Sequence, residues 1–498
     1  MTRYFHLHFI FIVLFFTFLI SSCSVQKKIT RSAQELVLKD SSLLKAHVGI
    51  SIFEPATNKY WFNYQGDKYF VPASNTKLPT CYAAMKYLED SLVGLKYGFA
   101  NDKDTIGSIL AFQPTGDPTF FHRDYKKHAV WDFLKQKSNT YKEQIAILDT
   151  TWQDERWGSG WSWSDYDADY MAERNVMPIY GNVVDVKLND YNERGIKDTN
   201  YFVDNHISLF TTQNTFFDIL LNWNTYLISR DAAFAKQPLL QIRRDIKSNV
   251  FWLDEGNRKF ANVSIPFVTG NAEGPWKISY STTLDILSEE LKYRFGKLFS
   301  RSKDTLYKFI GPDSRAVSIV IKKWHKIHSQ PTDSLLKPMM HRSDNFFAEQ
   351  SLLMVSNEKL GVMSDAKIID TLLKTDFKDL PQKPRWVDGS GLSRYNLFTP
   401  QDFVAILNKM KNEFGMERIK VILPTGGEGT ISNYFKADSG YIYGKTGTLS
   451  GVVAFSGFLY TKKGKLLIFS TLINNHQSSA TDIRKAIEKF LKKIRLDY

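Results

Sequence analysis

The chain has few cysteines, with only Cys23 and Cys81 among its 498 residues. A small secreted domain held together by several disulfides is therefore excluded. Low-complexity segments and long blocks of like charge are also missing, which argues against extensive disorder. Hydrophobic residues make up 43% of the chain and aromatic residues 14%, enough to build buried cores. The length predicts two to three folding units of about 100 to 200 residues each.

The positive charge is not gathered into one basic arm, although the formal net charge is +13. We find no zinc-finger spacing, basic zipper or RNA-binding aromatic signature, so no nucleic-acid partner is predicted. We interpret the charge as a soluble basic surface, with an anionic polymer of the cell envelope as the alternative partner. His325 and His328 in "WHKIH" lack the carboxylate block of a metalloprotease, so neither a metal site nor a cofactor is predicted.

The N-terminal apolar run is too short to span a membrane. It follows Arg3 and extends from about Phe9 to Ile20, whereas a spanning helix needs about 20 residues. A run of this length suits a secretory signal peptide. It ends in "ISSC", which resembles the bacterial lipobox, in which the signal is cut before the cysteine and the cysteine is acylated. We therefore expect residues 1–22 to be a signal peptide.

Cys23 is then expected to carry a lipid anchor that holds the protein on the periplasmic side of the cell envelope. The alternative is a cleaved signal followed by an incidental cysteine. After acylation of Cys23, Cys81 has no partner for an intrachain disulfide, and we interpret it as a small buried apolar side chain.

Periodicity predicts β-structure and helices at both ends of the chain. Residues 46–62 read as two strands joined by a turn, and "IYGKTGTLSGVVAFSGFLY" from Ile442 and "KLLIFSTLINN" from Lys465 read as a hairpin joined by "TKKGK". A helical stripe behind Ser74 contains Leu78, Cys81, Tyr82, Met85 and Leu88. A terminal helix, capped by Thr481 or Asp482, contains the stripe Ile483, Ile487, Leu491 and Ile494. We expect one α/β sandwich whose halves lie far apart in sequence.

Three short motifs follow one another along the chain. Serine three residues before lysine occurs seven times, so Ser74 and Lys77 in "VPASNTKLPT" mean little alone. They are followed by "SDN" at Ser343 to Asn345 and by "KTGT" at Lys445 to Thr448. This ordered trio is a specific signal for penicillin-binding proteins and class A β-lactamases.

The chemistry of the trio fits acyl transfer. The hydroxyl of Ser74 needs a neighbouring base to act as a nucleophile, and Lys77 is that base if it is deprotonated. Burial and a nearby cation favour the neutral amine, and we expect Lys445 to be that cation. Ser343 passes the proton to the leaving amine, and the amide of Asn345 binds a peptide backbone.

The strand around Lys445 offers groups for a terminal carboxylate. Lys445, Thr446 and Thr448 supply one ammonium and two hydroxyls. The backbone N–H groups of Ser74 and Thr448 are expected to form an oxyanion hole. Gly447, with Gly444, is expected to leave room for the approaching substrate strand.

Five blocks resemble the class C low-molecular-mass penicillin-binding proteins, which are D-alanyl-D-alanine carboxypeptidases and endopeptidases of the penicillin-binding protein 4 type. The blocks are "PASNTK", "HRSDNFFAEQ", "DGSGLSRYN", "LPTGGEGT" and "GKTGT". The resemblance extends from about residue 46 to the end. It implies hydrolysis of peptidoglycan stem peptides through a serine acyl-enzyme, with β-lactams as covalent inhibitors. It also implies that Asp165, which follows the Trp-x-Trp pattern in "GWSWSD", recognises substrate; a helix cap in an aromatic-rich core is the alternative.

The resemblance further implies a transpeptidase-like, β-lactamase-like domain with an antiparallel sheet flanked by helices and two domains inserted into it. We assign residues 23–90 and 320–498 to the catalytic domain, 91–180 and 268–319 to the first inserted domain, and 181–267 to the second. Two alternatives stay open, a β-lactamase or esterase on the same fold and an inactive peptidoglycan-binding scaffold. The balance of carboxypeptidase and endopeptidase activity and the oligomeric state are also open.

Overall fold

The computed structural model describes residues 25–99, 109–140, 145–148, 151–189, 200–204, 207–209, 226–230, 241–254, 263–270, 281–290, 296–302, 305–308, 318–319 and 321–498. The predicted signal peptide and Cys23 lie outside these residues. The chain divides into two compact units. The first unit contains residues 1–82, 337–343 and 372–498, and the second contains residues 83–336 and 344–371.

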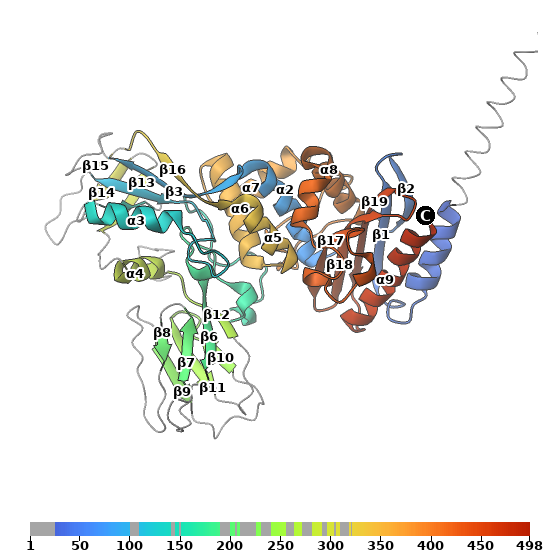
Figure 1. The fold of residues 1–498 in the computed structure, drawn as a ribbon, viewed down its shortest axis with the longest axis horizontal. Helices are drawn as coiled ribbons and strands as arrows, with labels where there is room; N and C mark the ends of the chain where they lie inside the picture. Colours follow the sequence, from blue (N-terminus) through green and yellow to red (C-terminus); the bar gives the residue numbers. More distant parts are fainter. Residues whose placement is uncertain are drawn as a thin grey trace, which may run out of the picture. The chain divides into compact units, whose positions relative to one another are not determined.

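A five-stranded antiparallel sheet forms the centre of the first unit (Figure 1). Its strands, in the order in which they pair, are β17 (Ile442–Leu449), β18 (Val452–Tyr460), β19 (Leu466–Asn474), β1 (His47–Glu54) and β2 (Lys59–Tyr64). β1 and β2 confirm the hairpin predicted at residues 46–62. Because β19 pairs with β1, the two ends of the sequence share one sheet, as predicted.

The β-rich run that begins at Ile442 is two strands rather than one. β17 ends at Leu449 and β18 begins at Val452, and the two pair as an antiparallel hairpin. Gly451 has a φ of +73° in the turn between them, a conformation that favours glycine. The predicted hairpin across "TKKGK" is confirmed as the pairing of β18 with β19.

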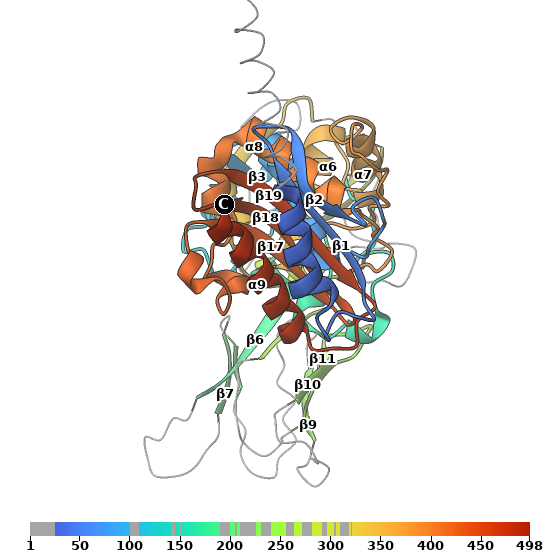
Figure 2. The same ribbon diagram turned by 90° about the vertical axis from the view of Figure 1, so that its right-hand side faces the viewer.

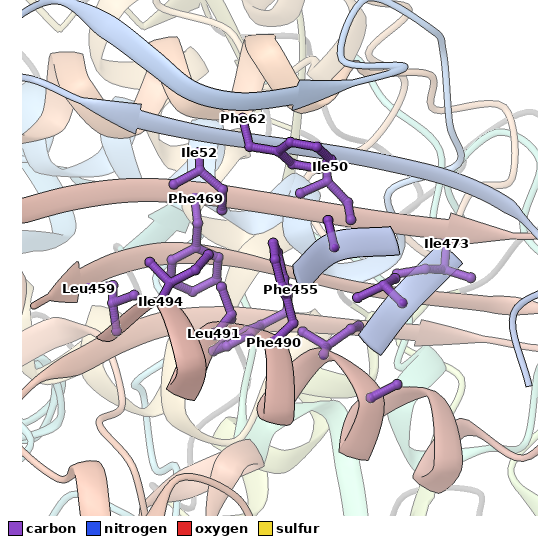
Figure 3. Packing of buried hydrophobic residues seen from close by; sticks show 14 of the residues in the cluster. Ile50, Ile52, Phe62, Phe455, Leu459, Phe469, Ile473, Phe490, Leu491 and Ile494 are labelled. Atoms are coloured by element: carbon purple, nitrogen blue, oxygen red, sulfur yellow. The ribbon is translucent and has the colours of Figure 1, made fainter. Parts of the chain in front are cut away.

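Helices cover both faces of this sheet. One face is covered by the helix over residues 25–33, by η1 (Gln34–Leu38) and by α9 (Ala480–Asp497), which lie side by side in Figure 2. α8 (Pro400–Ile422) packs against β1, β18 and β19 on the other face. Alternate strand residues, such as Ile52 and Phe469, face α9 and pack around Phe490 (Figure 3). This cluster is the hydrophobic core of the first unit.

A polar row crosses the opposite face of the same sheet. Ser51, Ser470, Ser456 and Lys445 are direct cross-strand neighbours on β1, β19, β18 and β17, and all four are fully buried. Successive residues of a strand point to opposite faces, so this row lies on the face away from α9. Ser456 Oγ donates a hydrogen bond to Ser470 Oγ at 2.8 Å. The sheet therefore has one apolar face and one face that holds buried hydroxyls and an amine.

Three sheets lie in the described part of the second unit. The largest has the order β15 (Ser318–Ile319), β14 (Thr305–Lys308), β13 (Gly296–Ser302), β5 (Ile145–Ile147), β4 (Leu110–Pro114), β3 (Ser91–Phe99), β16 (His325–Pro331). The second is β12 (Val263–Pro266), β6 (Val183–Asn189), β7 (Asn200–Asp204), β8 (Ile207–Leu209), and the third is β10 (Gln241–Arg244), β11 (Val250–Asp254), β9 (Tyr226–Arg230). The finer division into two inserted domains stays a prediction.

Several helices complete the fold. They are α2 (Lys77–Tyr87), α3 (Ala129–Thr140), α4 (Ser281–Glu290), α5 (Thr332–His341), α6 (Asn345–Leu360) and α7 (Asp365–Lys374). The short helices are η2 (Ala73–Thr76), η4 (Trp163–Asp165), η5 (Asp169–Met171), η6 (Tyr180–Asn182), η8 (Gly429–Ile431) and η9 (Lys436–Asp438). Within the described residues, none of the helices combines the length and the apolar character that crossing a bilayer requires.

Candidate active site

Ser74 lies in the short 3-10 helix η2, directly before α2 begins at Lys77. The predicted helix is therefore present, but its α-helical part starts three residues after the serine. Pro79 falls in the first turn of α2, where the missing N–H costs little. Lys77 Nζ lies 3.0 Å from Ser74 Oγ, and the lysine side chain is fully buried. The serine thus has an amine within hydrogen-bonding distance and shielded from bulk water.

The segment that carries Ser74 is fixed to the sheet by side-chain hydrogen bonds. Asn75 Nδ2 donates to Ser456 Oγ of the polar row at 2.7 Å. The side-chain amide of Asn474 bonds both backbone groups of Val71, accepting from its N–H at 2.7 Å and donating to its carbonyl at 3.0 Å. Because these partners lie on β18 and β19, these two strands determine the position of Ser74.

Ser343 and Lys445 form a second contact of the first unit. Ser343 follows the end of α5 with a φ of +62°, a left-handed conformation that is uncommon for serine. Lys445 Nζ donates to Ser343 Oγ at 2.8 Å and to the carbonyl of Thr446 at 2.7 Å. The i, i+2 spacing of Ser343 and Asn345 suggested a turn or a helix start, and the structure has Ser343 in the turn before α6.

The electrostatics of the site centre on two buried lysines. Burial and, secondarily, the charge of Lys77 hold the pKa of Lys445 well below its ordinary value. The sequence predicts that Lys445 is the cation that keeps Lys77 neutral. In the structure the charge of Lys77 acts on Lys445 and lowers the pKa of Lys445. Since two nearby ammonium groups disfavour each other, the pair favours states in which one amine is neutral. A neutral amine is what a general base requires.

The glycines of β17 let other parts of the chain approach this strand. A Cβ added to Gly447 would lie 2.7 Å from the carbonyl oxygen of Pro72 and 3.0 Å from the backbone nitrogen of Ser74. A Cβ on Gly444 would lie 2.8 Å from the carbonyl oxygen of Ser456. The space at the Cβ position of both glycines is therefore taken by the chain itself, and the approach of a substrate strand along β17 stays a prediction. Gly447 thereby lets the backbone of Ser74 approach β17.

The two threonines of "KTGT" have partners that the sequence did not predict. Thr446 Oγ1 donates to Thr430 Oγ1 of η8 at 2.7 Å, and Arg484 of α9 donates to Thr448 Oγ1. Because Ser74 N lies against Gly447, the two amides proposed for an oxyanion hole, those of Ser74 and Thr448, belong to adjoining segments. The geometry of β17 and η2 is therefore compatible with that role.

Asn345 and Asp165 belong to the second unit, where both interact with Tyr170. Asn345 is the first residue of α6, whose N-cap is Asp344, and its Nδ2 donates to the Tyr170 carbonyl at 3.0 Å. Burial and a hydrogen bond to the Asp165 carboxylate raise the pKa of the Tyr170 hydroxyl to about 12. Asp165 ends η4 and is half-buried. It does not cap a helix, which was the alternative interpretation.

Sequence reasoning missed three residues that contact the site. The carbonyl of Ser390 accepts a hydrogen bond from Lys77 Nζ at 2.7 Å, and Thr430 and Arg484 contact the threonines of β17. Ser390 and Thr430 lie in the quoted blocks "DGSGLSRYN" and "LPTGGEGT", so their location was signalled while their partners were not. Arg484 lies in the terminal helix, which was predicted only as a cover for the sheet.

Comparison with known proteins gives consistent matches over most of the chain. The model of the D-Ala-D-Ala carboxypeptidase 3 (S13) family matches residues 31–216 and 321–494. A D-alanyl-D-alanine carboxypeptidase of Actinomadura sp. (strain R39) is 24% identical over 470 residues, which cover 90% of this chain and 81% of the relative. The D-alanyl-D-alanine carboxypeptidase DacB of Haemophilus influenzae is 24% identical over 440 residues, which cover 84% of each chain.

The fold is also found in a solved structure. The crystal structure of penicillin binding protein 4 (dacB) from Haemophilus influenzae superimposes with a TM-score of 0.64 at 19% identity, covering 93% of this chain and 98% of that chain. This likeness confirms the predicted fold class, a transpeptidase-like domain with an antiparallel sheet flanked by helices. The family match confirms the predicted resemblance and the class of serine-type carboxypeptidase. The chain belongs to the D-Ala-D-Ala carboxypeptidase 3 (S13) family.

Proposed function

We propose that this protein removes the terminal D-alanine from peptidoglycan stem peptides, or cuts their cross-links, through an acyl-enzyme on Ser74. The observation that carries the proposal is the 3.0 Å contact between Ser74 Oγ and Nζ of the fully buried Lys77. A second buried lysine, Lys445, bonds Ser343 beside it. Family membership supplies the substrate class, D-Ala-D-Ala peptides.

Acylation begins with proton transfer from Ser74 to the neutral amine of Lys77. The Ser74 oxygen bonds to the carbonyl carbon of the penultimate D-alanine, and the carbonyl π electrons move to its oxygen. The backbone N–H groups of Ser74 and Thr448 stabilise that negative charge, each donor contributing about 3 kcal/mol in comparable sites. The negative charge therefore develops beside β17.

Collapse of this intermediate breaks the C–N bond. The leaving amine of D-alanine takes a proton from Ser343, whose hydroxyl is replenished from Lys77, so Lys77 and Ser343 end as they began and the proton of Ser74 leaves with the amine. The product is a Ser74 ester. A water molecule then attacks the ester with Lys77 again as base, which releases the shortened peptide and restores the serine.

Lys445 is proposed to bind the carboxylate of the substrate. Its lowered pKa reflects a buried charge with a like charge nearby, and an incoming carboxylate supplies the missing counter-charge. Substrate binding therefore favours the protonated form of Lys445. Thr446 contributes a hydroxyl beside this ammonium. In the second unit we propose that the Asn345 amide binds the peptide backbone and that Asp165 binds a free amine of the stem peptide.

Fluorescent penicillin tests the acyl-enzyme directly. One solved structure of Haemophilus influenzae penicillin binding protein 4 is in complex with a β-lactam, and this chain is proposed to react in the same way. We expect covalent label on the wild type, none on Ser74→Ala, and release of D-alanine from D-Ala-D-Ala peptides by the wild type alone. Equal labelling of the two proteins refutes the assignment of the nucleophile.

Two further assays distinguish the alternatives. Rapid turnover of nitrocefin without action on D-Ala-D-Ala peptides identifies a β-lactamase or esterase. Binding of muropeptides without release of D-alanine identifies a scaffold.

Mass spectrometry of digested muropeptides answers a different question, the balance of the two activities, because it separates carboxypeptidase products from cleaved cross-links.

We also propose that the protein is a lipoprotein of the cell envelope, cleaved before Cys23 and held on the periplasmic side by acyl chains. The basis is the lipobox-like "ISSC" behind a short apolar run. Two or more acyl chains give stable anchoring, whereas one is marginal. We expect the wild type to incorporate labelled palmitate and to fractionate with membranes. Cys23→Ser is expected to do neither, and equal membrane fractionation of both forms contradicts the anchor.

A further inference from the structure

The segment Asp388–Asn396 is folded around one buried carboxylate. Asp388 is fully buried. Its Oδ1 accepts hydrogen bonds from Gly391 N at 2.8 Å and from Asn396 Nδ2 at 2.7 Å, and its Oδ2 accepts from Ser393 N at 2.6 Å. Three donors on one carboxylate fix the path of the chain through Gly389, Ser390 and Gly391. We call residues 388–396 the carboxylate loop.

This loop contacts the catalytic segment at three points. The Ser390 carbonyl accepts from Lys77 Nζ at 2.7 Å, and the Gly389 carbonyl accepts from Thr80 Oγ1 at 2.7 Å. At Gly391, where φ is +85°, an added Cβ would lie 1.9 Å from the carbonyl oxygen of Ala73. Two of these contacts go to the first turn of α2, and the third goes to the residue before Ser74. The loop therefore packs on both sides of the nucleophile and its base.

The Ser390 carbonyl constrains how Lys77 uses its nitrogen. A carbonyl can only accept, so Nζ must direct one N–H at Ser390. A neutral amine has one lone pair, and the Ser390 contact limits rotation about the Cε–Nζ bond. The lone pair can then face Ser74 Oγ, 3.0 Å away. When Lys77 takes the proton from Ser74, the same carbonyl stabilises the new ammonium.

We propose that Asp388 is a positioning residue for the general base, acting through the Ser390 carbonyl on Lys77. This inference rests on the proposed acyl-enzyme mechanism and adds a residue to it. Asp388 does not touch the reacting atoms. It holds the loop so that the carbonyl is presented to Nζ at one distance and in one direction. Without the carboxylate the loop relaxes and Lys77 is held less well.

The test measures β-lactam acylation of the full chain in two parts, the non-covalent affinity and the first-order acylation rate. In Asp388→Asn one carboxylate oxygen becomes an NH2 group that faces a donor. We expect the acylation rate to fall about 10- to 100-fold, since a displacement near 1 Å costs about that much. The non-covalent affinity is expected to stay within about twofold, because the groups proposed to bind substrate are unchanged.

Asp402→Asn is the matched control. Asp402 is also fully buried and accepts backbone hydrogen bonds from Thr399 and Gln382. It completes the capping box of α8 with the N-cap residue Thr399, and both of these partners lie outside the carboxylate loop. We expect it to lower the melting temperature and leave the acylation rate unchanged. If Asp388→Asn acylates as fast as Asp402→Asn, the inference is overturned.

A second variant keeps the inference testable if Asp388→Asn does not fold. Thr80→Val removes the hydroxyl that holds Gly389 and leaves the carboxylate intact. A smaller fall in the acylation rate, again with unchanged affinity, supports the inference, and an unchanged rate overturns it. Labelling of the wild type at Ser74 tests the proposed function separately. If the wild type is not labelled, the proposed function is refuted. If the wild type is labelled and both Asp388→Asn and Thr80→Val acylate at its rate, only the positioning role is refuted.

Discussion

At the scale of single residues, Lys77 and Lys445 are buried in an environment that disfavours their charged forms. Lys445 lies at the end of the buried polar row and has a pKa well below its ordinary value, mainly because of burial. An unfolded lysine has a pKa of about 10.4. Between the lowered pKa and that value the unfolded chain binds more protons, so this residue makes stability rise with pH.

Lys445→Met is therefore expected to abolish this part of the pH dependence. The melting temperature of the wild type should rise as the pH is raised from 7 to 9.5, and that of the variant should rise less. The variant should also lose acylation. Differential scanning calorimetry at several pH values measures both profiles. Lys489→Met, which removes an exposed lysine, controls for the loss of one positive charge. Parallel profiles for wild type and Lys445→Met would contradict the prediction.

Gly447→Ala is expected to slow acylation at least about 100-fold. The new Cβ meets the Pro72 carbonyl and the Ser74 nitrogen, so the nucleophile or β17 must shift by a distance that matters for catalysis. The rate of labelling by fluorescent penicillin measures the effect. Gly440→Ala is the control, because a Cβ there meets nothing within 4 Å although φ is +79°. It should cost about 1 kcal/mol of stability and leave labelling unchanged; a normal rate in Gly447→Ala argues against the close approach.

The sequence identified the motif residues because the reaction limits which side chains can serve. It could not show that Ser74 lies in a 3-10 turn, that Ser343 has a positive φ, or that Lys77 bonds the Ser390 carbonyl. A backbone carbonyl has no sequence signature, since every residue has one. Its position depends on the fold of the carboxylate loop, and the block "DGSGLSRYN" did not indicate where the carbonyl groups of that loop point.

At the scale of elements, the spacing of apolar residues predicted which face of the terminal helix is buried. Ile483, Ile487, Leu491 and Ile494 were placed on one face of the terminal helix, and all are buried in α9. The N-cap is Ser479, whose side chain accepts from Asp482 N, rather than Thr481 or Asp482. Several residues near the start of a helix can cap it. Which of them becomes the N-cap depends on the path of the chain between the end of β19 and the first turn of α9.

Phe490→Ala is expected to destabilise the protein by about 3 to 5 kcal/mol, since Phe490 is fully buried between α9 and the sheet and its removal leaves a cavity. Urea unfolding measures the loss. Leu496→Ala on the same helix, where the side chain is 56% exposed, should change stability by less than about 0.5 kcal/mol. The core lies on the sheet face away from the polar row, so the folded fraction should still acylate. Equal losses in the two variants would show that this packing is not the source of stability.

At the scale of the whole molecule, each unit has its own buried centre. In the second unit Arg174 is 1% exposed and pairs with Asp154 at 2.8 Å, Glu349 at 3.2 Å and Asp365 at 2.7 Å. Burial opposes the charge of Arg174, but the carboxylates raise its pKa above the ordinary value. Burial raises the pKa of Asp154 to about 6 despite the arginine. Scattered glycine and proline signals did not predict this cluster, because its members come from segments far apart in the chain.

Arg174→Met is expected to cost about 3 to 5 kcal/mol at pH 7, because it leaves buried carboxylates without their cation. The loss should shrink at pH 5. A carboxyl whose folded pKa is raised contributes stability below its unfolded pKa and loses it as pH rises through the folded value. Urea unfolding at both pH values gives the comparison. Arg123→Met, which breaks a pair whose arginine is 59% exposed, should cost less than about 1 kcal/mol. A deficit in Arg174→Met that grows on acidification would refute this account.

The central place of β19 has a consequence for how the protein is made. β1 and β2 are synthesised early and pair with each other, but the neighbour of β1 on its other side is β19, which is synthesised much later. Ser74 is therefore synthesised long before the strands that fix it, and Lys445 joins it only when residues 442–474, which form β17, β18 and β19, have been made. A nascent chain therefore cannot act on peptidoglycan until these strands have been synthesised and have paired with β1. A copy lost to premature termination in that segment has a serine but no catalytic site.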